Sequence, residues 1–159
     1  MMRSFSLAEA KGWLGAQCAS GDLASVSFAG VSTDTRTLEP GQLFVALRGE
    51  NFDGHRFLQQ AMDKGAVGLV VDTPDTNLAL PQLVVNDTLE ALARLAAANR
   101  EESTAAILAI TGSSGKTTVK EMIASILAAA FGEEARLATR GNLNNEIGVP
   151  LTLFRLNEE

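Results

Sequence analysis

The sequence predicts an α/β protein: a small N-terminal α/β unit followed by the first part of a phosphate-loop unit with a parallel sheet. Short apolar runs alternate with segments of helical periodicity, which is the pattern of strands covered by helices. A strand, a glycine loop and a helix are expected in that order over residues 105–131. With 46% hydrophobic and 20% charged residues, the chain has the composition of a globular protein.

The first half predicts helices and strands in alternation. Residues 6–9 (SLAE) have the spacing of a capping box, so we expect a helix from there to about Cys18. The weakly alternating run 26–33 and the apolar run 42–47 predict strands, with a turn signal between them at residues 39–41. The further elements expected here are a helix over residues 57–65 and buried strands at 66–71 and 83–85.

The second half begins with Asp87, which is expected to cap another helix. Residues 105–111 predict a buried strand, and the helix after the glycine loop has one apolar face. That face comprises Val119, Met122, Ile123, Ile126, Leu127 and Ala130. The polar segment 74–81, bounded by two prolines, is the best candidate linker. We therefore expect domains at residues 1–82 and 83–159, the second incomplete because its few strands cannot build a covered sheet.

Charge and residue counts exclude several classes of protein. Thirteen Lys and Arg against nineteen Asp and Glu give a net charge of −6, which disfavours non-specific binding of nucleic acid. One cysteine and one histidine exclude an internal disulfide framework and the usual cysteine-rich or multi-histidine metal centres. The longest nearly apolar stretch, residues 123–131, is far shorter than the roughly 20 residues of a spanning helix. We expect a soluble cytoplasmic protein without membrane insertion.

The segment ILAITGSSGKTTVKEM carries the clearest functional signal. Glycines at 112 and 115 let backbone N–H groups approach an anion, and the start of the following helix adds its positive dipole end. Lys116 can reach the β- and γ-phosphates of ATP, and the hydroxyl of Thr117 can complete the coordination of Mg²⁺. The predicted ATP-binding residues are Gly112, Ser113, Ser114, Gly115, Lys116, Thr117 and Thr118.

The loop departs from the general phosphate-loop pattern in one place. That pattern has a glycine at the position of Ile110, so this is the shorter G-x-x-G-K-T-T form. The alternative interpretation is a glycine-serine turn with an exposed lysine. After Thr118 no apolar strand ends in the acidic residue that phosphate-loop enzymes use to hold Mg²⁺.

Two other polar clusters are candidate binding segments. Residues 32–36 (STDTR) place hydroxyls, a carboxylate and a guanidinium at a strand end, where they could bind a polar ligand or bond their own backbone as a turn. Residues 139–150 (TRGNLNNEIGVP) offer amides and one carboxylate, as a substrate-positioning loop or an ordinary surface loop would. His55 is interpreted as a polar residue at a helix start.

Together these segments resemble the Mur ligases, the ATP-dependent amide-forming enzymes of peptidoglycan precursor synthesis. The resemblance rests on the loop GSSGKT, on STDTR with PGQLFVALRGENFDGHRF, and on TRGNLNNEIGVPLTLF, in that order. The third segment is similar to the version in the members that add the terminal dipeptide. The resemblance covers the chain from about Ser32 to its end and implies that the chain is an N-terminal fragment, inactive alone.

The resemblance implies an activity and its substrates. An ATP-dependent ligase would join D-alanyl-D-alanine to UDP-N-acetylmuramoyl-tripeptide through an acyl phosphate, with Mg²⁺ as cofactor. Lys116 would contact the γ-phosphate as the catalytic residue. The implied substrate-binding residues are Thr33, Asp34, Thr35, Arg36, Glu50, Asn51, Phe52, Asn144 and Asn145.

Three other functions stay open. Within the family, the alternative is the ligase that adds the third amino acid to a UDP-N-acetylmuramoyl-dipeptide. A non-catalytic UDP-sugar-binding module would bind the uridine ligand without ATP binding that depends on Lys116. A stand-alone phosphate-loop kinase or phosphatase would turn over ATP without a UDP ligand.

Overall fold

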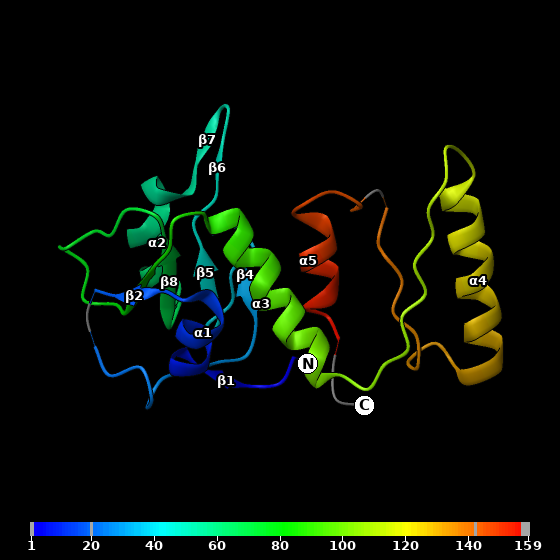
Figure 1. The fold of residues 1–159 in the computed structure, drawn as a ribbon, viewed down its shortest axis with the longest axis horizontal. Helices are drawn as coiled ribbons and strands as arrows, with labels where there is room; N and C mark the ends of the chain where they lie inside the picture. The colour runs from blue at the N-terminus through cyan, green and yellow to red at the C-terminus, as the bar shows by residue number, and fades with distance from the viewer. Residues whose placement is uncertain (1, 20, 142, 157–159) are drawn as a thin grey trace.

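The computed structural model describes residues 2–19, 21–141 and 143–156 (Figure 1). Its centre is a five-stranded sheet with the strand order β2-β9-β8-β5-β4. These strands are β2 (Gln17–Cys18), β4 (Val31–Ser32), β5 (Leu43–Val45), β8 (Gly68–Val71) and β9 (Gln82–Val84). The expected α/β class is therefore confirmed.

Four neighbouring strands of this sheet, β4, β5, β8 and β9, run parallel, and only the edge strand β2 is antiparallel. The parallel strands follow one another in space in the order in which they occur in the chain. Their carboxyl ends therefore lie along a single edge of the sheet, where ligands of open α/β sheets commonly bind.

Helices cover both faces of the sheet because successive strand side chains point to opposite sides. Leu43 and Val45 pack with α1 (Leu7–Leu14) and α3 (Thr88–Glu102), whereas Phe44 between them packs with α2 (Leu58–Asp63). The remaining elements are two pairs of short antiparallel strands, a 3-10 turn and two helices: β1 (Phe5–Ser6), β3 (Ser27–Phe28), β6 (Arg48–Gly49), β7 (Phe52–Asp53), η1 (Gly54–Phe57), α4 (Lys116–Phe131) and α5 (Gly148–Leu153).

The predicted helix caps are confirmed, but the first helix is shorter than expected. The Ser6 hydroxyl accepts a hydrogen bond from the Glu9 N–H at 3.2 Å, and the Glu9 carboxylate accepts one from the Ser6 N–H at 2.7 Å. The helix ends at Leu14 rather than near Cys18 because Gly15 adopts a left-handed conformation with φ +60°. Asp87 caps α3 as predicted.

The predicted strand over residues 26–33 is two separate strands. β3 pairs antiparallel with β1, whereas β4 pairs parallel with β5 in the main sheet. Gly30, with φ +153°, lies between them. A strand pattern that contains a glycine often marks such a change of direction.

The candidate linker is not a linker between domains. Residues 74–81 connect β8 to β9, which are adjacent parallel strands of one sheet. Leu78 and Leu80 of this connection pack on the same core as α2. A boundary at residue 82 would cut strand β9.

The predicted buried strand at 105–111 is not formed. These residues have no regular secondary structure, and Ile107 and Leu108 are exposed. A strand of a parallel sheet requires neighbours for its backbone hydrogen bonds, and none of the described strands pairs with this segment. Within the described residues, no helix is both long and apolar enough to span a bilayer.

Candidate functional site

The glycine loop lies directly before α4, and two of its glycines have a positive φ. Gly112 and Gly115 have φ of +156° and +76°, and Gly115 is the N-cap of α4. No side chain caps this helix, so its first N–H groups have no side-chain acceptor. The Lys116 ammonium donates a hydrogen bond to the carbonyl of Gly112, which keeps its charge at the loop.

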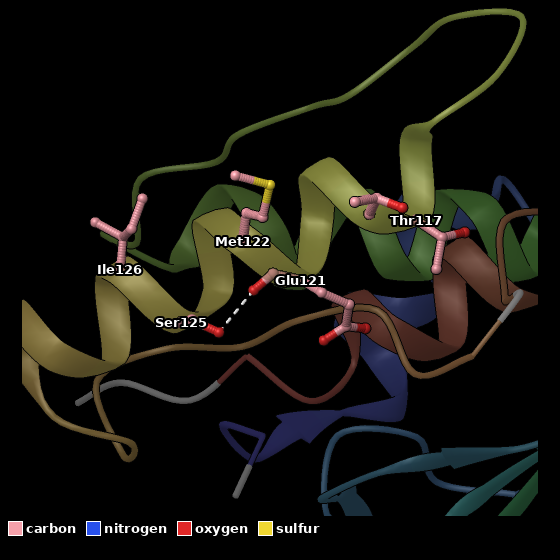
Figure 2. A pocket seen from close by; sticks show the side chains of 6 residues that line it. Thr117, Glu121, Met122, Ser125 and Ile126 are labelled. Carbon is pink, nitrogen blue, oxygen red and sulfur yellow. Dashed lines mark hydrogen bonds between the residues drawn. The ribbon is translucent and has the colours of Figure 1, made fainter.

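An open hollow of about 570 Å³ runs along α4 from this loop. Figure 2 shows the side chains that line it, among them Thr117 and Glu121 near the start of the helix. Met122 and Ile126 line it further along and are 60% and 64% exposed. The apolar face predicted for this helix is present, and most of it is not buried in the described chain, because only Ala124 of α4 is buried.

Residues 33–36 form the turn that follows β4. The Arg36 guanidinium donates to both carboxylate oxygens of Asp34, at 3.0 and 2.6 Å. The Thr35 hydroxyl is buried and donates to the Gln60 side chain of α2 at 2.8 Å. These contacts are those of the turn interpretation, and Thr35 in particular serves internal packing.

Glu50 and Asn51 form the tip of the β6–β7 hairpin and are exposed. Phe52 follows them, and its ring stacks on Phe57 with a centroid distance of 5.7 Å and an interplanar angle of 12°. Figure 1 shows the hairpin projecting from the body of the protein. Because β6 directly follows β5, the hairpin rises from the same sheet edge as residues 33–36.

The base of the hairpin carries a network that sequence reasoning missed. The Arg48 guanidinium donates to both carboxylate oxygens of Asp72, at 2.7 and 2.8 Å, and to Asp53 at 2.7 Å. The His55 ring lies 2.8 Å from the Asp53 carboxylate and accepts the Asp72 N–H at 3.1 Å. The one available signal was the position of Asp72, directly after the predicted strand 66–71.

Asp34, Asp53 and Asp72 at this edge have lowered pKa values, and the backbone hydrogen bond from His55 is the main cause for Asp53. The hydrogen bonds from Arg48 lower the pKa of Asp72 from 3.8 to about 2, more than burial raises it. The hydrogen bonds from Arg36 lower the pKa of Asp34. All three side chains are therefore anionic at neutral pH, and each is already paired with an arginine.

The asparagine cluster lies at the start of α5, a helix that the sequence did not predict. The Asn145 side chain accepts the N–H of Gly148 at 2.7 Å, so it tethers the first turn of this helix, whereas Asn144 is exposed. The buried Asn99 side chain of α3 donates to the carbonyl of Leu153 at 2.9 Å and ties α5 to α3.

The structure brings some predicted site residues together and leaves others apart. Residues 33–36 and the hairpin that carries residues 50–52 both follow strands at the carboxyl edge of the sheet. The glycine loop and α4 stand at the opposite end of the view in Figure 1, away from that edge. Among the described residues, no group of three or more His, Cys, Asp or Glu could hold a metal ion.

A glycine loop that opens a long helix, together with an α/β unit whose polar strand ends share one edge, is typical of α/β proteins that bind nucleotides. Comparison with known families narrows this class. Residues 27–100 match the Mur ligase family, catalytic domain, and residues 110–159 match the Mur ligase middle domain. The chain belongs to the Mur ligase family.

Curated relatives carry the name UDP-N-acetylmuramoyl-tripeptide–D-alanyl-D-alanine ligase. The protein from Haemophilus influenzae is 54% identical over 130 residues, which are 81% of this chain and 28% of the relative. The protein from Escherichia coli K12 is 52% identical, over 86% of this chain and 29% of the relative. This chain therefore spans less than a third of the length of these relatives.

Solved structures agree with this placement. A structure of MurF from Acinetobacter baumannii superposes with a TM-score of 0.85 at 36% identity, covering 99% of this chain and 34% of that one. MurF ligase from Thermotoga maritima in complex with ADP superposes with a TM-score of 0.66 at 30% identity, over 79% of this chain and 28% of that one.

Proposed function

We propose that this chain is part of an ATP-dependent ligase that joins D-alanyl-D-alanine to UDP-N-acetylmuramoyl-tripeptide. The observation that carries the proposal is the glycine loop, in which two positive-φ glycines, an uncapped helix start and Lys116 converge. The names of the relatives supply the substrates, and the relative solved with ADP supports nucleotide binding. We propose the cytoplasm, where ATP is available, as its location.

In the proposed reaction ATP transfers its γ-phosphoryl group to the terminal carboxylate of the tripeptide, which gives an acyl phosphate and ADP. The amine of D-alanyl-D-alanine then attacks the acyl carbon, inorganic phosphate leaves, and the amide bond forms. Lys116 and the N–H groups at the start of α4 neutralise phosphate charge. This work is positioning and electrostatic stabilisation.

The residues present also fit a magnesium ion beside the phosphates. Thr117 lines the hollow at the start of α4, and a threonine hydroxyl at this place in a phosphate loop is a usual Mg²⁺ ligand. Bound Mg²⁺ would offset the negative charge of the triphosphate. The other loop residues assigned to ATP are Gly112, Ser113, Ser114, Gly115 and Thr118.

The uridine diphosphate part of the substrate is assigned to the carboxyl edge of the sheet. Residues 33–36 and the β6–β7 hairpin both follow strands at this edge, and the exposed hairpin tip and the stacked Phe52 ring offer polar groups beside an aromatic face. Asn144 and Asn145 are assigned to the muramoyl-peptide end. We further propose two domains that divide after α3, because the two family matches are separated between residues 100 and 110.

An amide-resolved NMR titration tests the two sites separately. UDP-N-acetylmuramoyl-tripeptide should shift amides at 33–36 and 50–53, and Mg-ATP should then shift amides at 113–118. Lys116→Ala should remove only the second response, whereas Lys11→Ala, at an exposed position of α1, should remove neither. A folded chain that gives no response to the uridine ligand contradicts the uridine assignment.

A reaction assay tests whether this chain suffices for catalysis. We expect no phosphate release and no pentapeptide product from the chain with ATP, the tripeptide nucleotide and D-alanyl-D-alanine, because the chain matches less than a third of the length of these relatives. Product formation that Lys116→Ala abolishes would show that these residues form a complete active site.

A further inference from the structure

The β6–β7 hairpin cannot hold its own position. Each of its strands has two residues, and the register pairs only Arg48 with Asp53 and Gly49 with Phe52. An isolated two-stranded hairpin is marginally stable in water. The contacts at its base, together with the stacking of Phe52 on Phe57, therefore decide where its tip, residues 50–52, lies.

Those base contacts form a closed ring of four residues, which the backbone N–H of Asp72 completes. Arg48 joins Asp72 to Asp53, and His55 joins Asp53 back to the backbone of Asp72. Because His55 Nε2 accepts the Asp72 N–H, the ring hydrogen lies on Nδ1 and is donated to Asp53. Each contact in the ring is thus a directed hydrogen bond.

Asp72 is the member of this ring that belongs to the sheet. It directly follows β8, a fully buried strand at the centre of the sheet, whereas Arg48 and Asp53 belong to the hairpin and His55 to η1. Its side chain is 23% exposed, against 47% for Arg48. Asp72 therefore anchors the hairpin, through Arg48, to the end of a buried strand of the sheet.

We propose that Asp72 is a positioning residue for nucleotide recognition, which fixes Arg48 and His55 and so presents residues 50–52 to the uridine nucleotide. This inference rests on the proposed function of the hairpin tip. A guanidinium held by both carboxylate oxygens fixes direction as well as distance, which a lysine at the same place would not do.

The test measures hairpin order and ligand affinity separately in the chain as it stands. In Asp72→Asn we expect the backbone amides of residues 49–52 to become mobile in ¹⁵N relaxation while α3 is unchanged. The Kd for UDP-N-acetylmuramoyl-tripeptide should rise about tenfold, as a loosened binding loop implies. Asp63→Asn, which replaces a carboxylate that accepts a hydrogen bond from Gln59 within α2, is the matched control and should change neither quantity.

Arg48→Lys keeps the positive charge and removes the planar guanidinium. It should therefore also make the hairpin mobile and raise the Kd. Because the Arg48 side chain is half-exposed, we expect this variant to fold. The double variant with Asp72→Asn should be no worse than either single variant, because both break the same contact. Additive losses would mean that Asp72 acts independently of Arg48, and would overturn the inference.

Other outcomes separate this inference from the proposed function. Asn51→Ala should weaken binding with the hairpin still ordered. An Asp72→Asn chain with an ordered hairpin overturns the positioning role whatever its affinity. If the wild-type chain does not bind the uridine nucleotide, the proposed function of the tip fails, and hairpin order in Asp72→Asn still decides whether Asp72 holds it.

Discussion

Gly54 offers a sharp test of how closely the hairpin base packs against the sheet. It begins η1 directly after β7 and is buried, and its N–H donates to the Leu47 carbonyl at 2.8 Å. A β-carbon there would lie 2.9 Å from the Leu47 nitrogen and 3.0 Å from the Ala46 α-carbon. Both are backbone atoms at the end of β5, so no side-chain rotation can relieve the contact.

Gly54→Ala should therefore lower the free energy of unfolding by about 1–3 kcal/mol, the usual cost of overpacking a closed site. Gly12→Ala is the matched control, because it adds the same methyl group within α1 where a β-carbon meets nothing within 4 Å. Gly12→Ala should raise the free energy of unfolding by about 0.5–1 kcal/mol, because alanine has a higher helix propensity than glycine.

Urea unfolding followed by far-UV circular dichroism measures both changes, with the midpoints converted at a common slope. The two substitutions should move the midpoint in opposite directions. A surface substitution usually changes the free energy of unfolding by no more than about 0.5 kcal/mol. If the free energy of unfolding of Gly54→Ala lies that close to the wild-type value, Gly54 is not closely packed against the backbone of Ala46 and Leu47.

Three further predictions concern stability. Ile126→Ala should change the free energy of unfolding by less than about 0.5 kcal/mol, because Ile126 is exposed. Leu92→Ala, in the buried face of α3, should lower it by about 2–5 kcal/mol. Urea unfolding measures both changes, and equal losses would contradict the exposure of α4. Asn99→Ala should lower the free energy of unfolding by about 1 kcal/mol, because it removes the hydrogen bond to the Leu153 carbonyl. Thermal melting measures this loss, and an unchanged midpoint would contradict it. The free energy of unfolding should fall as the pH drops from 3.8 to about 2, because Asp72 is protonated at a higher pH in the unfolded chain than in the folded one. In Asp72→Asn the free energy of unfolding should fall less steeply over this range. Acid unfolding measures both profiles, and identical profiles would contradict the pairing with Arg48.

Local sequence signals predicted the elements whose determinants are themselves local. The capping box at Ser6 and the cap at Asp87 begin helices where expected, and the glycine loop precedes α4. These features depend on a few adjacent residues, so the sequence alone contains them. The family resemblance was confirmed for the same reason, since its motifs are short and contiguous.

Elements that depend on distant partners were predicted less well. An apolar run such as 105–111 has strand composition, but it becomes a strand only where another strand pairs with it. The ring of Arg48, His55 and Asp72 joins residues up to 24 positions apart, and no periodicity or motif brings them together. Helix α5 was missed because its segment contains Gly148 and Pro150, which are typical of loops.

Because α5 is attached to α3, residues 103–147 form a long connection that leaves α3 at its end and returns to it at α5. Asn99 and the packing between the two helices hold the returning end, and α3 itself holds the departing end. Loop-closure entropy grows only slowly with length, so such a connection can be long without weakening the body from which it leaves. Because only Ala124 of α4 is buried, we expect this segment to open locally while the sheet and its hairpin stay folded. The glycine loop and the hairpin are therefore expected to differ in local stability.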